Sequence, residues 1–168
     1  MECLSISDAK LLNSTSDGDI EGVMAALAQG GRVTVTNPHG VTPLIVAAFN
    51  GRTEICGLLL AHGSNVNEVE PDTKHTALHL AAGKGDNASV EVLLSWGAEI
   101  NPQNYAGFSP LHFACQEGHL PCVRSLLKAG ASLTLPDNKD NLPIHIAAQK
   151  TGWKLSEPYW SVAAVQIW

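Results

Sequence analysis

An internal repeat of about 33 residues constrains this chain more than any other feature of its sequence. Four segments share a pattern of a hydroxyl residue or Leu, a small residue, a large aliphatic residue, His or Ile, another apolar residue, and two small residues. The segments begin at Thr42, Thr76, Ser109 and Leu142, which stand 34, 33 and 33 residues apart. A repeat of this length is typical of solenoids, because one unit cannot bury its apolar face without stacking on a neighbour.

Three of the four units contain the signals of two short antiparallel helices. Thr or Ser opens three of the four segments, and hydroxyl side chains are favoured helix N-caps. Proline stands at the first helical position in Pro43, Pro110 and Pro143, where the missing N–H is tolerated. Three segments then reach a glycine that suits a tight turn, followed by a Leu-Leu pair on the apolar face of a second helix.

The segment from Thr76 to Ala82, the glycine turn and the Leu-Leu pair before a glycine resemble the ankyrin repeat. The resemblance is strong from residue 37 to about 150. It implies an all-α fold, an ankyrin-repeat solenoid of about five stacked helix-turn-helix units with protruding finger loops. It also implies that the histidine of the pattern (His79, His112 and His145) hydrogen-bonds to the loop of an adjacent unit.

The same resemblance divides the chain into units. We expect a degenerate N-terminal capping unit, three repeats, and a partial repeat with a divergent apolar tail, at 1–36, 37–70, 71–103, 104–136 and 137–168. The cap should expose its outer face to water. In the tail, Pro158 forbids one continuous helix, and the tail is interpreted either as an improvised apolar cap or as a divergent or truncated end.

Two finger loops depart from the pattern. Lys74 and Asp140 occupy the loop position that Gly40 and Gly107 hold in the other repeats, so positive φ is expected there at residues other than glycine. The connection that ends at Thr76 is also one residue longer than the others, and its finger loop should bulge.

Charge and composition limit the classes of partner. With 10 Lys and Arg against 16 Asp and Glu, the net charge is −6, which disfavours both nucleic acid and an anionic membrane surface. The longest apolar stretch, 44–49, is far too short to span a bilayer, and the first residues have no basic, apolar leader. The four cysteines follow no disulfide-framework spacing. We therefore expect a monomeric stack in the cytoplasm, the nucleus or both.

A cluster of potential zinc ligands lies at His112, Cys115, His119 and Cys122. The repeat itself accounts for most of these positions, and a glycine turn divides the cluster, so we predict no metal and keep a zinc-binding protein as an alternative. The sequence contains no phosphate loop, nucleophile elbow or dinucleotide fingerprint. We expect a chain that is not an enzyme and holds no cofactor.

Asn101 follows an acidic and an aliphatic residue after a Leu-Leu pair. This context resembles ankyrin sites that are modified by the asparaginyl hydroxylase that also acts on hypoxia-inducible factor, and Asn67 is a weaker match. The alternative is that the asparagine only stabilises the loop turn through its side chain.

The resemblance implies a non-enzymatic protein–protein interaction module, a scaffold, adaptor or inhibitor, whose partner the sequence does not identify. A further alternative is the substrate-recruiting segment of a larger multidomain protein. Partners of this family usually contact finger-loop tips and the exposed side of each first helix. Carried over, these positions are Pro38, His39, Val41, Phe49, Asn50, Asp72, Thr73, His75, Lys84, Tyr105, Phe108, Gln116, Glu117, Asn138, Lys139, Asn141 and Lys150.

Three aromatic residues stand out among these positions. Phe49, Tyr105 and Phe108 are candidate interface anchors, because large apolar side chains at exposed positions often bury on binding. The alternative is that they pack between loops within the stack.

Overall fold

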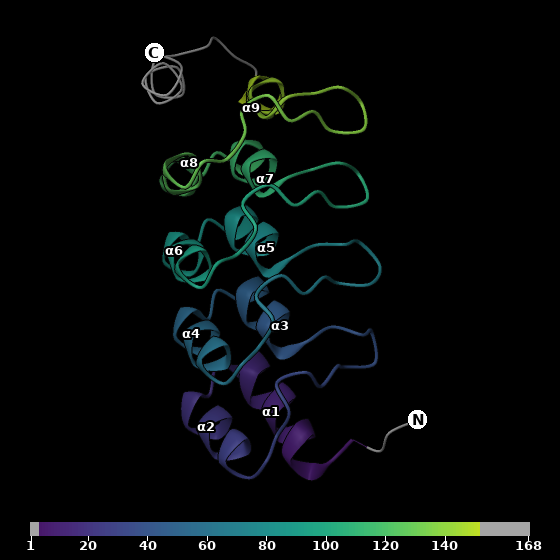
Figure 1. The fold of residues 1–168 in the computed structure, drawn as a ribbon, viewed down its shortest axis with the longest axis vertical. Helices are drawn as coiled ribbons and strands as arrows, with labels where there is room; N and C mark the ends of the chain where they lie inside the picture. Colours follow the sequence, from purple (N-terminus) through teal and green to yellow (C-terminus); the bar gives the residue numbers. More distant parts are fainter. Residues whose placement is uncertain (1–3, 152–168) are drawn as a thin grey trace.

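The computed structural model describes residues 4–151, which form an elongated stack of short helices (Figure 1). The helices pair in chain order, and the last described helix has no described partner. Their bounds are α1 Ile6–Asp17, α2 Ile20–Ala28, α3 Pro43–Phe49, α4 Thr53–Ala61, α5 Ala77–Lys84, α6 Asn87–Ser95, α7 Pro110–Glu117, α8 Leu120–Lys128 and α9 Pro143–Thr151. The predicted all-α repeat solenoid is confirmed.

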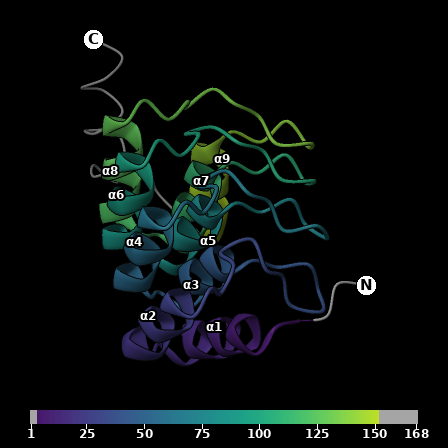
Figure 2. The same ribbon diagram turned by 60° about the horizontal axis from the view of Figure 1, so that its bottom comes forward.

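The helices form two layers (Figures 1 and 2). The first helices of the units, α1, α3, α5, α7 and α9, pack successively against one another. The second helices, α2, α4, α6 and α8, form the other layer in the same way. The finger loops all project from the side of the first helices, which are therefore called the inner layer (Figure 2). The inner layer and the loops together make one extended face.

The predicted caps begin and end these helices. The side chains of Thr76 and Ser109 each accept a hydrogen bond from the main-chain N–H three residues later. The ring of the histidine at that later position accepts a hydrogen bond from the main-chain N–H of the cap residue, which completes a capping box. Gly85 and Gly118 end α5 and α7 in the left-handed conformation, at φ +80° and +78°. Glycine reaches this conformation without the penalty that a Cβ imposes, so the chain can turn at once into the next helix.

Apolar side chains from both layers form one continuous core. Leu44, Leu78 and Leu111 of the inner layer are at most 1% exposed, and so are Leu59 and Leu93 of the outer layer. Each fully buried side chain of this size stabilises the fold by about 1.5–3 kcal/mol. Because leucines recur at the same position in successive units, this energy holds neighbouring repeats together.

The finger loops deviate where the sequence predicts it. Lys74 and Asp140 both adopt φ +61°, the left-handed conformation that Gly40 and Gly107 adopt in the other loops. In the longer loop the N–H of Lys74 reaches back four residues to a carbonyl, at 2.8 Å, whereas the N–H of Gly40 reaches back three. The extra residue thus widens the turn.

The first unit combines an ion pair between Asp8 and Arg32 with exposed apolar side chains. Asp8 accepts hydrogen bonds from the side chain and main chain of Arg32, and these hold the pKa of its carboxyl well below the usual range. However, Ile6 is 89% exposed and Met24 is 55% exposed, so the surface of this unit is more apolar than expected. The interpretations of the tail concern residues outside the described part. No helix in residues 4–151 has the length and hydrophobicity of a membrane span.

Candidate partner-binding face

The predicted contact positions lie on the inner layer and the finger loops, with different exposure. Nine are exposed: Pro38, His39, Phe49, Asp72, Lys84, Tyr105, Glu117, Asn138 and Lys139. Six are half-buried: Asn50, Thr73, His75, Phe108, Gln116 and Asn141. The side chain of Lys150 lies outside the described part. These nine residues are the exposed part of the predicted contact positions.

Two of the predicted positions need correction. Val41, the last residue before Thr42, is buried, with 9% of its surface exposed, although it belongs to the lining of a hollow on this face. Phe108 is half-buried, with its ring edge-to-face against His112 at 5.4 Å between centroids and tilted against Phe113 at 5.8 Å. For Phe108 the packing alternative therefore describes the structure better than an interface anchor does.

Phe49 and Tyr105 remain open to a partner. Phe49, the last residue of α3, is 62% exposed, and Tyr105, on a finger loop, is 65% exposed. An aromatic ring this exposed gains little from the fold and can gain much from burial by another protein. These two side chains are the strongest candidate anchors on the face.

Two hollows flank Phe49. One, of about 310 Å³, lies between α3, α5 and two finger loops, and its lining includes Val46, Leu80, Glu70 and Asp72. The other, of about 260 Å³, lies toward α7 and is lined also by Lys84. Phe49 and Leu80 belong to both linings. Phe49 therefore forms a ridge between two adjoining depressions.

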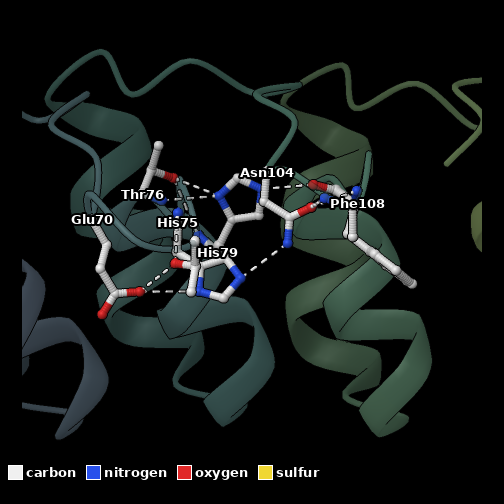
Figure 3. A network of polar contacts seen from close by, with 8 residues as sticks. Glu70, His75, Thr76, His79, Asn104 and Phe108 are labelled. Atoms are coloured by element: carbon white, nitrogen blue, oxygen red, sulfur yellow. Dashed lines mark hydrogen bonds and ion pairs between the residues drawn. The ribbon is translucent and has the colours of Figure 1, made fainter. Parts of the chain in front are cut away.

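A buried histidine ties each of two inner helices to the next finger loop. The Nδ1 of His79 accepts a hydrogen bond from the N–H of Thr76 at 3.1 Å, so Nε2 carries the proton and donates to the carbonyl of Phe108 at 2.9 Å (Figure 3). His112 makes the same pair of bonds with the N–H of Ser109 and the carbonyl of Asn141. The expected bond from this histidine to an adjacent loop is confirmed at both positions.

Burial disfavours the charged form of these rings. It lowers the pKa of His79 from 6.5 to about 4, and it lowers the pKa of His112 in the same direction. Both rings act as neutral structural bridges at neutral pH.

A second polar network orders the longer finger loop. The Nδ1 of His75 lies 3.4 Å from Glu70, which also accepts a hydrogen bond from Thr73 (Figure 3). The Nε2 of His75 faces the amide nitrogen of Asn104 at 3.0 Å. The amide oxygen of Asn104 accepts from two main-chain N–H groups of its own loop, which fixes the orientation of the amide. His75 therefore joins two successive finger loops, and much of its polar surface is already used.

Sequence reasoning missed three residues that shape the hollow beside Phe49. Val46 and Leu80 occupy variable positions of the repeat pattern, and both are half-buried. Glu70 stands where the other finger loops have Asn37, Asn104 and Asp137, whose side chains accept hydrogen bonds within their loops. This difference is visible in the sequence and could have indicated an altered loop, because glutamate has a longer side chain than the Asn or Asp at the equivalent positions.

The zinc alternative finds no support in the geometry. The Nε2 of His119 is hydrogen-bonded to the carbonyl of Gly83 at 3.1 Å. Both ring nitrogens of His112 already make hydrogen bonds, to Ser109 and Asn141. Burial raises the pKa of Cys115 to about 12 and that of Cys122 to about 11, which disfavours the thiolate that zinc requires. Across residues 4–151, no three His, Cys, Asp or Glu side chains are grouped so that they could hold a metal ion.

Asn67 and Asn101 have equivalent places in successive units. The side-chain oxygen of Asn67 accepts from the N–H of Glu99, and that of Asn101 accepts from the N–H of Ser132, each at 2.8 Å. Both amides therefore join one loop to the next, which agrees with the alternative that these asparagines stabilise the loops through their side chains. Hydroxylation at either residue stays a prediction.

Comparison with known proteins returns one repeat family over most of the chain. The family model described as ankyrin repeats (3 copies) matches residues 11–104, and the one described as ankyrin repeats (many copies) matches residues 97–147. The matched segments include α3, α5 and α7, the finger loops and both hollows.

Individual relatives resemble only part of the chain. It is 44% identical over 73 residues, 43% of its length, to the ankyrin repeat and KH domain-containing protein mask of Drosophila melanogaster. It is 38% identical over 91 residues, 52% of its length, to the putative E3 ubiquitin-protein ligase XBAT35 of Arabidopsis thaliana. These matches cover 2% and 20% of the two relatives, so the chain corresponds to a small part of each.

Proposed function

Because this chain belongs to the ankyrin-repeat family, whose repeats are protein–protein interaction modules, we propose that it is a non-enzymatic module that holds a partner protein. The partner would lie along the finger loops and the inner layer. The observation that carries the proposal is the 62% exposure of Phe49 between two hollows of that layer. A scaffold, an adaptor and an inhibitor would all use this face.

The proposal predicts different effects for exposed and for buried side chains on stability and on binding. Replacing Phe49 and Tyr105 by alanine removes two exposed rings, so each change should alter the free energy of unfolding by less than about 0.5 kcal/mol. Each of the same changes should weaken the binding of a partner by about 1–3 kcal/mol. Leu93→Ala should do the opposite, because Leu93 is fully buried, and should cost about 2–5 kcal/mol of stability.

Affinity capture followed by titration of the captured partner tests this. The wild type is compared with the Phe49→Ala/Tyr105→Ala double variant and with Trp96→Ala. Trp96 is a matched control, because it is 49% exposed but follows α6 in the outer layer. The double variant should lose the partner and Trp96→Ala should keep it. Circular dichroism verifies that all three proteins are folded. If all three then retain the partner equally, the inner face is not the binding surface and that part of the proposal is wrong.

The same proposal includes a recruiting role within a larger protein. Its support is that one relative is named a putative E3 ubiquitin-protein ligase, of which the match covers only 20%. Immunoblotting of the source cells with an antibody to this chain tests the idea, because a recruiting segment would appear at a mass well above 17.7 kDa.

We also propose a reducing compartment, the cytoplasm or the nucleus. The three cysteines of the described part, Cys56, Cys115 and Cys122, are free and buried, which suits an environment in which thiols persist. Imaging of the tagged chain in its source cells tests this placement.

A further inference from the structure

The joint between α3 and α5 differs from the next two joints of the inner layer, α5–α7 and α7–α9. At this position Ile45 replaces the histidine that ties α5 and α7 to the next loop, so no such bridge forms here. Main-chain bonds link the next two pairs of loops, from Tyr105 to Thr73 and from Asn138 to Ala106, each at 3.1 Å. Loops 37–41 and 70–75 are both described, and no hydrogen bond joins them. The hollow opens where two neighbouring fingers are not tied together.

The floor and the edge of this hollow have different chemistry. Val46, Phe49 and Leu80 provide partly exposed apolar surface. At the edge stand two carboxylates, Glu70 and Asp72, and the lining contains no Lys or Arg. The hollow therefore combines an apolar surface with negative charge.

The two carboxylates are not equally available. Glu70 uses one oxygen, Oε2, toward His75 and Thr73. Asp72 is exposed, and no described residue donates a hydrogen bond to it or lies within ion-pair distance. An exposed acid beside an apolar hollow favours a cation whose stem can also cover apolar surface, which is a property of Lys and Arg side chains.

The neighbouring hollow indicates that the occupant is a chain and not a small molecule. It shares Phe49 and Leu80 with the first, and it is lined by one basic and one acidic residue, Lys84 and Glu117. A ligand that fills both depressions must cross the Phe49 ridge. An extended peptide does so naturally, since every second side chain along its backbone points to the same face.

We infer that the hollow between α3 and α5 receives an extended segment of a partner protein in which a Lys or Arg stands two residues from a bulky aliphatic residue, so that both side chains point into the hollow. The aliphatic side chain packs on Phe49, Val46 and Leu80, and the cationic side chain pairs with Asp72. This inference rests on the proposed function and adds the chemistry of the partner to it. The charge pair contributes selectivity and the apolar contact contributes most of the affinity.

The test begins with a library of random 12-residue peptides displayed on phage, selected on the wild-type chain. A peptide with the consensus of the selected sequences is then synthesised with a fluorophore, and its Kd is measured by polarisation. We expect Lys or Arg two residues from Leu, Ile, Val or Met in the consensus. Phe49→Ala should raise the Kd at least about 10-fold. Asp72→Asn should raise it about 2- to 5-fold and reduce its dependence on salt.

Asp140→Asn is the matched control, because Asp140 is also an exposed finger-loop acid but does not line the hollow. The Kd of the consensus peptide for Asp140→Asn should equal its Kd for the wild type. A consensus without basic residues, with binding that depends on Phe49 but not on Asp72, would overturn the inference and leave the proposed function standing. If no selected peptide depends on Phe49, the inference fails together with the proposed use of this part of the face.

Discussion

The Nε2–H of His79 donates a 2.9 Å hydrogen bond to the carbonyl of Phe108, across the joint between α5 and the next finger loop. Nδ1 of the same ring accepts from the N–H of Thr76. A proton added at Nδ1 would face that donor, so the two bonds coexist only with a neutral ring. His112 repeats the arrangement one unit later. We therefore expect the cohesion between these units to depend on pH.

The first prediction follows from the sign of this linkage. Burial lowers the folded-state pKa of His79 to about 4, below the ordinary value of 6.5, so the unfolded chain binds more protons between these values. The stabilisation is complete above pH 6.5 and is lost as the pH falls toward 4. The loss should be on the order of 3 kcal/mol for His79, since one pKa unit corresponds to about 1.4 kcal/mol.

Urea unfolding followed by circular dichroism, at pH steps from 7.5 to 4, measures this loss. The lowered pKa of His112 adds to it with the same sign. The variant His79→Leu should be less stable at pH 7 and should also depend less on pH in this window. A wild-type stability that stays constant from pH 6.5 to 4 would contradict the prediction. The lowered pKa values of Asp8 and Asp137 act only at lower pH, below the ordinary carboxyl value of 3.8.

The second prediction concerns a pair of equivalent threonines. Thr76 caps α5 and bonds His79, whereas Thr42 begins α3 with a buried hydroxyl that has no hydrogen-bond partner. Thr42→Val keeps the shape and removes an unsatisfied polar group, so stability should stay the same or rise by up to about 1 kcal/mol. Thr76→Val removes a cap and should cost about 1–2 kcal/mol. Thermal unfolding of both variants checks this, and an equal cost for the two would contradict it.

The regular part of the fold could be read from the sequence because it depends on local chemistry. The caps, the glycine turns and the leucine positions each act within one unit, and the same spacing predicted the positive φ of Lys74 and Asp140. The candidate site depends on contacts between units. Phe108 was expected to be exposed, but it packs on His112 and Phe113. The hollow beside Phe49 requires Leu80 from the next unit, and a pattern within one repeat carries no information about that contact.

The third prediction contrasts two glycines. Gly57 lies inside α4, and a Cβ added there would meet no atom within 4 Å. Gly57→Ala should therefore stabilise the protein by about 0.5–1 kcal/mol. Gly85 has φ +80°, and a Cβ would come within 2.6 Å of the ring of His119. Gly85→Ala should destabilise it by more than about 1 kcal/mol. Equilibrium unfolding in urea measures both, and a loss of stability in Gly57→Ala would be the contrary result.

The fourth prediction concerns the proposed hydroxylation of Asn101. Its amide oxygen accepts from the N–H of Ser132 in the next unit, so the side chain is held in the stack even though the residue is exposed. An enzyme that modifies its Cβ must first draw this loop away from its neighbour. Loosening that neighbour should therefore increase modification. Leu126 is fully buried in α8, the second helix of the unit that contains Ser132, and Leu126→Ala should open this joint at a cost of about 2–5 kcal/mol.

Co-expression with the asparaginyl hydroxylase, followed by peptide mass spectrometry, measures the fraction of Asn101 that has gained one oxygen atom. That fraction should be higher in Leu126→Ala than in the wild type. Leu11→Ala is the matched control, because Leu11 is equally buried but lies in α1, far along the stack from this joint. It should leave the fraction closer to that of the wild type. If Asn101 gains no oxygen in any of the three proteins, its amide has only the structural role of joining two repeats.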